Sequence, residues 1–124
     1  MAKTSEDKDA IRELYARYCL YFDEGASEKW ADCYTANGEF IGAGEHLTGR
    51  QAMVDFLDKI GASNLHRFTT NHIIDLDGDR ATCRSSVLLL HGGAIASSGR
   101  TVDELERVDG DWKVARRIYT GDTR

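Results

Sequence analysis

The stretch HRFTTNHIIDLDGDRA, from His66 to Ala81, carries the strongest fold signal in this chain. Polar and apolar residues alternate along 65–76, which is the period of a β-strand, and DGD at 77–79 is a strong hairpin turn. The partner strand is expected at about 80–90. A second hairpin, in VDGDW at 108–112, joins a strand at about 99–108 to a last strand at 112–119. The second half of the chain therefore predicts an antiparallel meander.

Helical periodicity precedes these strands. Between Asp9 and Gly25 the apolar residues recur at intervals of three and four, which places them on one face of an amphipathic helix. This apolar stripe consists of Ile11, Leu14, Tyr15, Tyr18 and Phe22. Ser5 or Asp9 is expected to cap the start of the helix, and Gly25 is expected to stop it.

Shorter elements are expected between this helix and the meander. A second helix is predicted at 27–36, with Ser27 as its N-cap and Trp30 on its buried side. A short strand at 39–41 and a third helix at about 50–60 follow. Helices followed by an antiparallel meander predict an α+β domain, with three helices packed on one face of a curved sheet.

Size and charge limit the functions that the chain can have. Its 124 residues predict one domain over 1–124. The net charge of −5 argues against a nucleic-acid partner, because phosphate neutralisation needs a basic face. No stretch reaches the length of a membrane span, and the polar N-terminus lacks a secretory signal, so a cytoplasmic protein without membrane contact is expected. The 3 cysteines lack CxxC spacing, which predicts neither a disulfide framework nor a zinc site.

Alternation along the strand at 65–76 predicts which of its side chains face the interior. Its even positions are the more apolar set, so His66, Phe68 and His72 are expected to point toward the core or a cavity. A β-bulge would reverse the alternation locally and bring Arg67 or Asn71 inward instead.

The same alternation on the last strand puts Arg116 on one face with Trp112 and Val114, and puts Arg117 on the opposite face. An unpaired buried guanidinium is costly, so Arg116 is expected to pair with a carboxylate or to bind an anionic ligand. The carboxylates that we consider for this pair are Asp23, Asp103 and Glu104.

An acid, imidazoles and a phenol on separate elements suit proton transfer on a small ligand. Asp23 lies in the last turn of the first helix, where burial would raise the pKa of a carboxylate and a cationic partner would lower it again. His66 or His72 is the expected proton-transfer partner, and Tyr18 is placed to donate a hydrogen bond to an oxygen that gains charge. No metal site is expected, because close ligand spacing is missing.

Five sequence segments together suggest a family. They are AIRELYARYCLYFDEG (10–25), WADCYTANGEF (30–40), the Gly49-Arg50 start of the third helix, N-x-x-I-x-L-x-G-D-x-A (71–81) and R-x-D-G-x-W-K-V (107–114). In these segments the chain resembles the SnoaL-like branch of the nuclear transport factor 2-like superfamily, also described as cystatin-like. The resemblance implies a cone formed by a curved antiparallel sheet and three N-terminal helices.

The resemblance also implies chemistry. Family members include ketosteroid isomerase, scytalone dehydratase, limonene epoxide hydrolase and polyketide cyclases. Several eliminating members carry an aspartate at the end of the first helix, which Asp23 matches, and a histidine early in the long hairpin strand. Counting back from Asn71 places Arg67 at the second position and His66 one residue away. A pair of Asp23 with a histidine and a pair of Asp23 with Arg67 therefore both remain open.

The leading expectation is a cofactor-free lyase or isomerase, of dehydratase, isomerase or cyclase type, acting on a small hydrophobic or polycyclic ligand. Its catalytic residues would be Asp23, His66 and His72. Its ligand-binding residues would be Tyr18, Phe22, Trp30, Arg67, Phe68 and Arg116. A non-catalytic binding or assembly module is the alternative, and an epoxide hydrolase with an Asp–Arg–Asp set is a weaker one. The resemblance further implies a homo-oligomer, most simply a dimer formed through the exposed sheet face.

Overall fold

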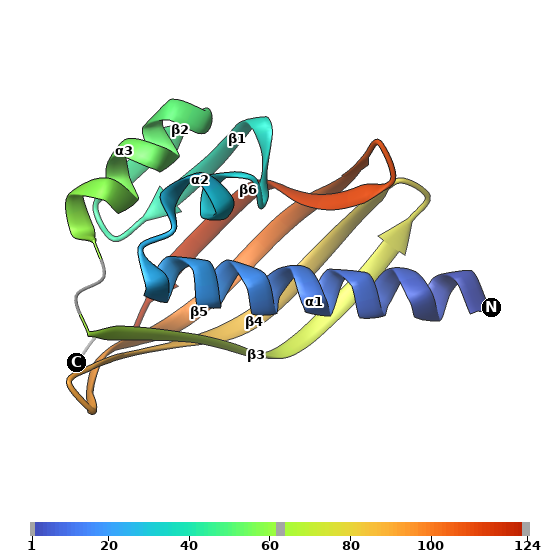
Figure 1. Ribbon diagram of the computed structural model, residues 1–124. Helices are drawn as coiled ribbons and strands as arrows, with labels where there is room; N and C mark the ends of the chain where they lie inside the picture. Colours follow the sequence, from blue (N-terminus) through green and yellow to red (C-terminus); the bar gives the residue numbers. More distant parts are fainter. Residues whose placement is uncertain (1, 62–63, 123–124) are drawn as a thin grey trace.

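A computed structural model of the protein describes residues 2–61 and 64–122 (Figure 1). The elements are α1 (Ala2–Glu24), α2 (Ser27–Ala31), β1 (Tyr34–Gly42), β2 (Glu45–Thr48), α3 (Arg50–Ile60), β3 (Leu65–Asp77), β4 (Arg80–His91), β5 (Ala94–Val108) and β6 (Asp111–Gly121). The strands form one sheet in the order β2-β1-β6-β5-β4-β3, in which β1 and β6 are parallel and the other neighbours antiparallel. The predicted α+β architecture is confirmed.

The helices cover one face of the sheet. Figure 1 shows α1 lying lengthwise across this face, which we call the helix face, with α2 and α3 toward β1 and β2. The predicted apolar stripe of α1 is buried against the sheet, each of its side chains being at most 4% exposed: Ile11, Leu14, Tyr15, Tyr18 and Phe22. Burial of this stripe is what fixes the helix on the sheet. No helix in the described ranges is long and apolar enough to cross a membrane.

α1 begins earlier than the sequence predicts. It starts at Ala2, so Ser5 and Asp9 lie within the helix and do not cap it. Tertiary contacts explain the extra turns, because the Asp7 carboxylate accepts hydrogen bonds from Arg107 Nη1 at 2.7 Å and Trp112 Nε1 at 3.3 Å. Both partners belong to the β5–β6 hairpin, which local propensity cannot anticipate.

α2 is shorter than predicted. It ends at Ala31, and the chain is already extended from Tyr34 onward, so the strand expected at 39–41 is the middle of a longer one. Ser27 does not cap α2, and its hydroxyl instead donates to Asp58 of α3 at 2.5 Å. The third helix matches its predicted range of 50–60. Pairing of β1 with β6 favours the extended chain over a longer helix.

A β-bulge divides β3 into two halves with opposite alternation. Between the pairs Thr70–Ser86 and Ile73–Arg84, β3 has one residue more than β4. Odd-numbered side chains face α1 before the bulge, and even-numbered ones after it. The prediction that His66 and Phe68 face inward is therefore wrong, since the His66 side chain is 58% exposed and Phe68 is 47% exposed.

The last strand contains a second irregularity. Leu105 pairs with Val114 while Glu104 pairs with Arg116, so Ala115 is an extra residue in β6. Trp112 and Val114 face the helices as predicted, but Arg116 lies on the opposite, outer face of the sheet. The expectation that Arg116 is the inward arginine is wrong, because the bulge reverses the alternation after Val114.

Arg117 is the inward arginine, and it forms a buried ion pair with Asp103 of the neighbouring strand. Neither side chain is exposed, and Arg117 donates to Asp103 through Nη2 at 2.9 Å and Nε at 3.0 Å. The Tyr15 hydroxyl donates to the same carboxylate at 2.6 Å. Burial alone would lower the pKa of Arg117, but Asp103 raises it well above its ordinary value, so the guanidinium stays charged.

We expect Arg117→Met to lower the free energy of unfolding by about 3–5 kcal/mol, because it strands the Asp103 carboxylate in a buried site. The neighbouring Arg116→Met is the matched control and should change stability by no more than about 0.5 kcal/mol. Urea unfolding of both variants measures the difference. Equal losses of stability in the two variants would contradict the bulge at Ala115, because that bulge places Arg117 inside and Arg116 outside.

Candidate functional site

A groove of about 390 Å³ lies between α1 and β3 and brings several titratable side chains together. It is lined by Arg12, Tyr15, Ala16, Cys19, Leu20, Asp23, His66, Arg67, Phe68, Thr69 and His72. Tyr15, Cys19 and Asp23 are spaced by four residues, so α1 presents all three on the same side. Burial raises the pKa of the Cys19 thiol, which therefore stays protonated and is a poor nucleophile.

Asp23 occupies the C-terminal end of this groove. Its side chain is 13% exposed, its Oδ1 accepts the backbone N–H of Arg67 at 2.8 Å, and its Oδ2 lies 3.7 Å from His66 Nδ1. Burial raises the pKa of Asp23, and the Arg67 N–H together with the nearby charges of His66 and Arg67 opposes part of this rise. The carboxylate is thus held in place, and its pKa is higher than that of an exposed aspartate.

The contact with Arg67 depends on the place of β3 in the sheet. β3 is the outermost strand, so one of its edges has no strand partner in the described part of the chain. Unpaired edge N–H groups need another acceptor. Asp23 supplies one for Arg67, and this hydrogen bond ties the end of α1 to the strand that carries the histidines.

His66 lies at the rim of the groove beside Asp23. The separation of 3.7 Å between the two side chains is within ion-pair distance but too long for a hydrogen bond. Catalytic hydrogen bonds are often this long before a substrate binds. The exposed imidazole is therefore accessible to solvent and lies next to the Asp23 carboxylate.

Arg67 faces the groove floor rather than solvent. Its guanidinium lies 4.3 Å from the centroid of the Phe22 ring, which is a cation–π contact. Its Nε is buried and has no hydrogen-bond partner among the described residues. A positive charge is thus held close to Asp23, where an oxygen of a bound ligand could use it.

The other end of the groove is formed by His72 and Tyr15. Their rings are stacked with centroids 4.8 Å apart, and His72 Nε2 is buried without a hydrogen-bond partner among the described residues. Burial lowers the pKa of His72, and Arg117 and Arg12 lower it further, so this imidazole is neutral at pH 7. On α1 the eight residues from Tyr15 to Asp23 span about 12 Å. His72 is therefore remote from the acid at Asp23.

Other predicted site residues lie elsewhere. Tyr18, Phe22 and Trp30 are buried in the core, and the Tyr18 hydroxyl is hydrogen-bonded to Tyr34 at 2.7 Å. Arg116 lies outside the groove, 3.8 Å from Glu104 and 3.9 Å from a second glutamate. The groove thus brings together Asp23, His66, Arg67, Phe68 and His72 from the predicted set.

Sequence reasoning missed other groove residues. Tyr15 and Cys19 had a usable signal, because four-residue steps back from Asp23 lead to both of them. Thr69, which lies 3.7 Å from the Cys19 sulfur, had no such signal because its orientation depends on the bulge.

Two other kinds of site are not assembled in the described ranges. Arg117 is bonded to Asp103 rather than to Asp23, and no arginine side chain there donates to Asp23, so the Asp–Arg–Asp set of an epoxide hydrolase does not form. No three His, Cys, Asp or Glu side chains in those ranges are grouped to hold a metal ion.

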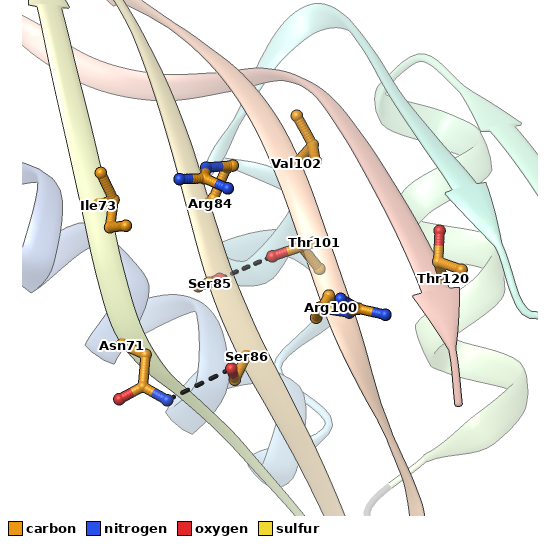
Figure 2. Close-up of a pocket in the computed structure, with 9 residues that line it drawn as sticks. All are labelled: Asn71, Ile73, Arg84, Ser85, Ser86, Arg100, Thr101, Val102 and Thr120. Carbon is orange, nitrogen blue, oxygen red and sulfur yellow. Dashed lines mark hydrogen bonds between the residues drawn. The ribbon is translucent and has the colours of Figure 1, made fainter. Parts of the chain in front are cut away.

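A second hollow, of about 410 Å³, lies on the outer face of the sheet (Figure 2). Arg84 and Arg100 line it together with Asn71, and none of its lining residues is acidic or a histidine. It therefore lacks a group with the ordinary pKa of a general base. The groove beside α1 is the better candidate for chemistry.

Comparison with known proteins was made with the whole chain. The family model of the SnoaL-like domain matches residues 3–118. A search of curated proteins found no match. A solved variant of Rv3472, a protein of unknown function from Mycobacterium tuberculosis, is 31% identical with a TM-score of 0.93, over 99% of this chain and 76% of that one.

Two further structures are similar. A proposed scytalone dehydratase from Novosphingobium aromaticivorans is 25% identical with a TM-score of 0.86, over 99% of this chain and 89% of the other. LinA is 20% identical with a TM-score of 0.84, over 97% of this chain and 88% of its own, and this likeness concerns the fold alone.

The Arg67 amide gives a direct test of the Asp23 environment. We expect its proton chemical shift to titrate with Asp23, with a midpoint above the ordinary value of 3.8, because the carboxylate accepts its hydrogen bond. NMR spectra recorded between pH 3 and 8 measure this midpoint. In Asp23→Asn the titration should disappear, and a midpoint at or below 3.8 in the wild type would contradict the predicted burial effect.

The raised pKa of Asp23 also predicts whether replacing this residue by a neutral one stabilises the protein. The folded state holds the Asp23 proton more tightly than the unfolded state, so the stabilisation is complete below pH 3.8 and is lost as the pH rises through the folded-state pKa. We therefore expect Asp23→Asn to have a higher Tm than wild type at pH 7, with the difference shrinking on acidification. Asp55→Asn, at an exposed position, serves as the control in thermal unfolding. A Tm of Asp23→Asn below that of the wild type at pH 7 would contradict the prediction.

Proposed function

This chain belongs to the SnoaL-like domain family, and from that membership we propose that it is a cofactor-free lyase or isomerase acting on a small, largely apolar ligand. The observation that carries the proposal is the carboxylate of Asp23, held 3.7 Å from the imidazole of His66 in a groove with apolar walls. The 25% identity with a proposed scytalone dehydratase agrees with this class of reaction.

The proposed reaction is a proton transfer shared by two groups. Asp23 removes a proton from a carbon next to a carbonyl or leaving group, and the C–H electron pair forms a carbon–carbon double bond. In a dehydration, protonated His66 gives its proton to the departing hydroxyl, which leaves as water. Asp23 then releases the acquired proton to solvent and the exposed His66 takes one up from solvent, which restores both groups.

The walls of the groove supply binding. Leu20 of α1 and Phe68 of β3 are 57% and 47% exposed, and both line the groove, so an apolar ligand would cover them. Arg67 is placed to stabilise an oxygen that gains negative charge. Buried side chains support the groove from the core, and they include Tyr18, Phe22 and Trp30. The ring of Phe22 contacts the Arg67 guanidinium directly.

A non-catalytic binding module is the second candidate. Phe22 and Trp112 are 4% and 6% exposed and fill space under the helices, so the interior on their side is occupied by protein. A binding module would hold a ligand in the groove without converting it to a product. Proton exchange distinguishes the two functions, because a binding module would not exchange the carbon-bound protons of its ligand.

We expect hydrogen–deuterium exchange and elimination when the protein is screened in D2O against cyclic ketones and β-hydroxy ketones. Asp23→Asn and His66→Gln should each lower kcat/KM by about 10²–10⁴-fold, the usual contribution of general acid–base groups. Asp55→Asn and His91→Gln are controls outside the groove and should leave the rate unchanged. Full activity in Asp23→Asn would disprove the mechanism, whereas binding without exchange across the screen would favour the second candidate.

We also propose that the protein is a cytoplasmic homodimer that pairs through the outer face of the sheet. Ile73 and Val102 are 51% and 50% exposed there, beside the basic pair Arg84 and Arg100. Glu104 and Glu106 lie further along the same sheet, so a second copy in the opposite orientation could bring unlike charges together. The free, reduced state of all 3 described cysteines agrees with a reducing compartment.

Light scattering after size exclusion tests this assembly. We expect a dimer for the wild type and a folded monomer for Val102→Asp, because the new carboxylate would be buried unpaired at the centre of the interface. Leu20→Asp places the same charge on an exposed apolar side chain of α1 and should remain dimeric. A monomeric wild type at micromolar concentration would overturn the proposal.

A further inference from the structure

We propose that Asn71 is a positioning residue for the Asp23–His66 site, because its backbone creates the bulge that decides which β3 residues meet α1. The inference rests on the proposed function for its catalytic consequence, but its structural part can be tested without a substrate. Asn71 is exposed, and its side chain contacts neither Asp23 nor His66 in the described structure, so any effect must act through the strand.

The backbone at Asn71 is unusual for a strand. Its φ is +59°, in the left-handed region, whereas the other described non-glycine residues with positive φ lie in turns or bends. Asparagine adopts this conformation more readily than most residues, and β-branched residues rarely do. The identity of residue 71 therefore affects whether the bulge can form.

The bulge is anchored on both faces of the sheet. On the outer face, Asn71 Nδ2 donates to the Ser86 hydroxyl at 3.3 Å, as Figure 2 shows. On the helix face, the next residue, His72, stacks on Tyr15. Across from them, the single residue Ser85 is buried and hydrogen-bonded to Thr101 at 2.6 Å. Thr70 and Asn71 thus lie on the same outer face, and the alternation resumes with the opposite parity at His72.

The geometry at Asp23 follows from this extra residue. Between the bulge and the start of β3, odd-numbered side chains point toward α1, and the Arg67 N–H points to the free edge where Asp23 accepts it. If residue 71 were instead part of a regular strand without the bulge, the alternation of the second half would continue through the first. His66 and Phe68 would then turn inward, and Arg67 would leave both Phe22 and Asp23.

Three substitutions separate the backbone effect from the side-chain effect. Asn71→Gly keeps the left-handed conformation, Asn71→Val opposes it, and Ser86→Ala removes the side-chain anchor while leaving the backbone free. Deletion of Asn71 restores a regular ladder without turning any other β3 side chain to the opposite face, so it is a control that should keep the Asp23 contact. Asn71→Thr, which is also β-branched, is the second route if Asn71→Val fails to fold. Circular dichroism selects the folded variants.

The primary measurement is the pH titration of the Arg67 amide, which reports Asp23 through their hydrogen bond. We expect it to persist in Asn71→Gly, in Ser86→Ala and in the deletion, and to be lost in Asn71→Val and Asn71→Thr, where new NOEs should join Phe68 to α1. An unchanged titration in folded Asn71→Val or Asn71→Thr overturns the proposal. Its loss in folded Asn71→Gly overturns it as well.

Kinetics supply the second measurement once a substrate is found. We expect kcat/KM to stay within about 2-fold of wild type in Asn71→Gly and to fall by about 10²-fold in Asn71→Val, the scale of a 1 Å misplacement of a catalytic group. Full activity in Asn71→Val overturns the positioning role. If the Arg67 titration responds as expected while the wild type shows no turnover, the positioning role stands and the proposed function fails.

Discussion

The buried ion pair between Arg117 and Asp103 is the constraint on which the arrangement of this protein depends. Two fully buried charges tolerate little displacement, because each is the only charged partner of the other among the described salt bridges. The Tyr15 hydroxyl donates a hydrogen bond to Asp103, and the Arg117 guanidinium lies 4.4 Å from the ring centroid of Tyr18. The ion pair therefore contacts α1 through two of its residues. This contact fixes the rotation of the helix about its own axis. Helical geometry then directs Cys19 and Asp23 toward β3.

The position of Asp23 combines a structural task with the chemical role that we propose for it. As an acceptor for the Arg67 N–H, it satisfies a donor on the open edge of the sheet. An uncharged acceptor such as asparagine could do this without the cost of burying a carboxylate, which is what raises its pKa. Retaining the charge at a stability cost is a feature of functional sites.

Each of the two bulges turns one arginine side chain toward the helix face of the sheet. The bulge in β6 turns Arg117 inward, where it meets Asp103, and the bulge in β3 turns Arg67 inward, where it meets Phe22. Each adds one residue to one strand and reverses every side chain on one side of it. The cationic groups of the core and of the groove are therefore both placed by local irregularities of the sheet.

The sequence by itself determined the three helices and the antiparallel meander after them, the apolar stripe of α1, the hairpins at DGD and VDGDW, and the place of Asp23 at the end of the helix, but it did not predict β2. These follow from periodicity and turn chemistry, which act over a few neighbouring residues. Tertiary structure decided which arginine is buried, which half of β3 turns His66 outward, and how far α1 and α2 extend. A single inserted residue reverses the alternation without changing the composition, so strand pairing rather than local pattern settles these positions.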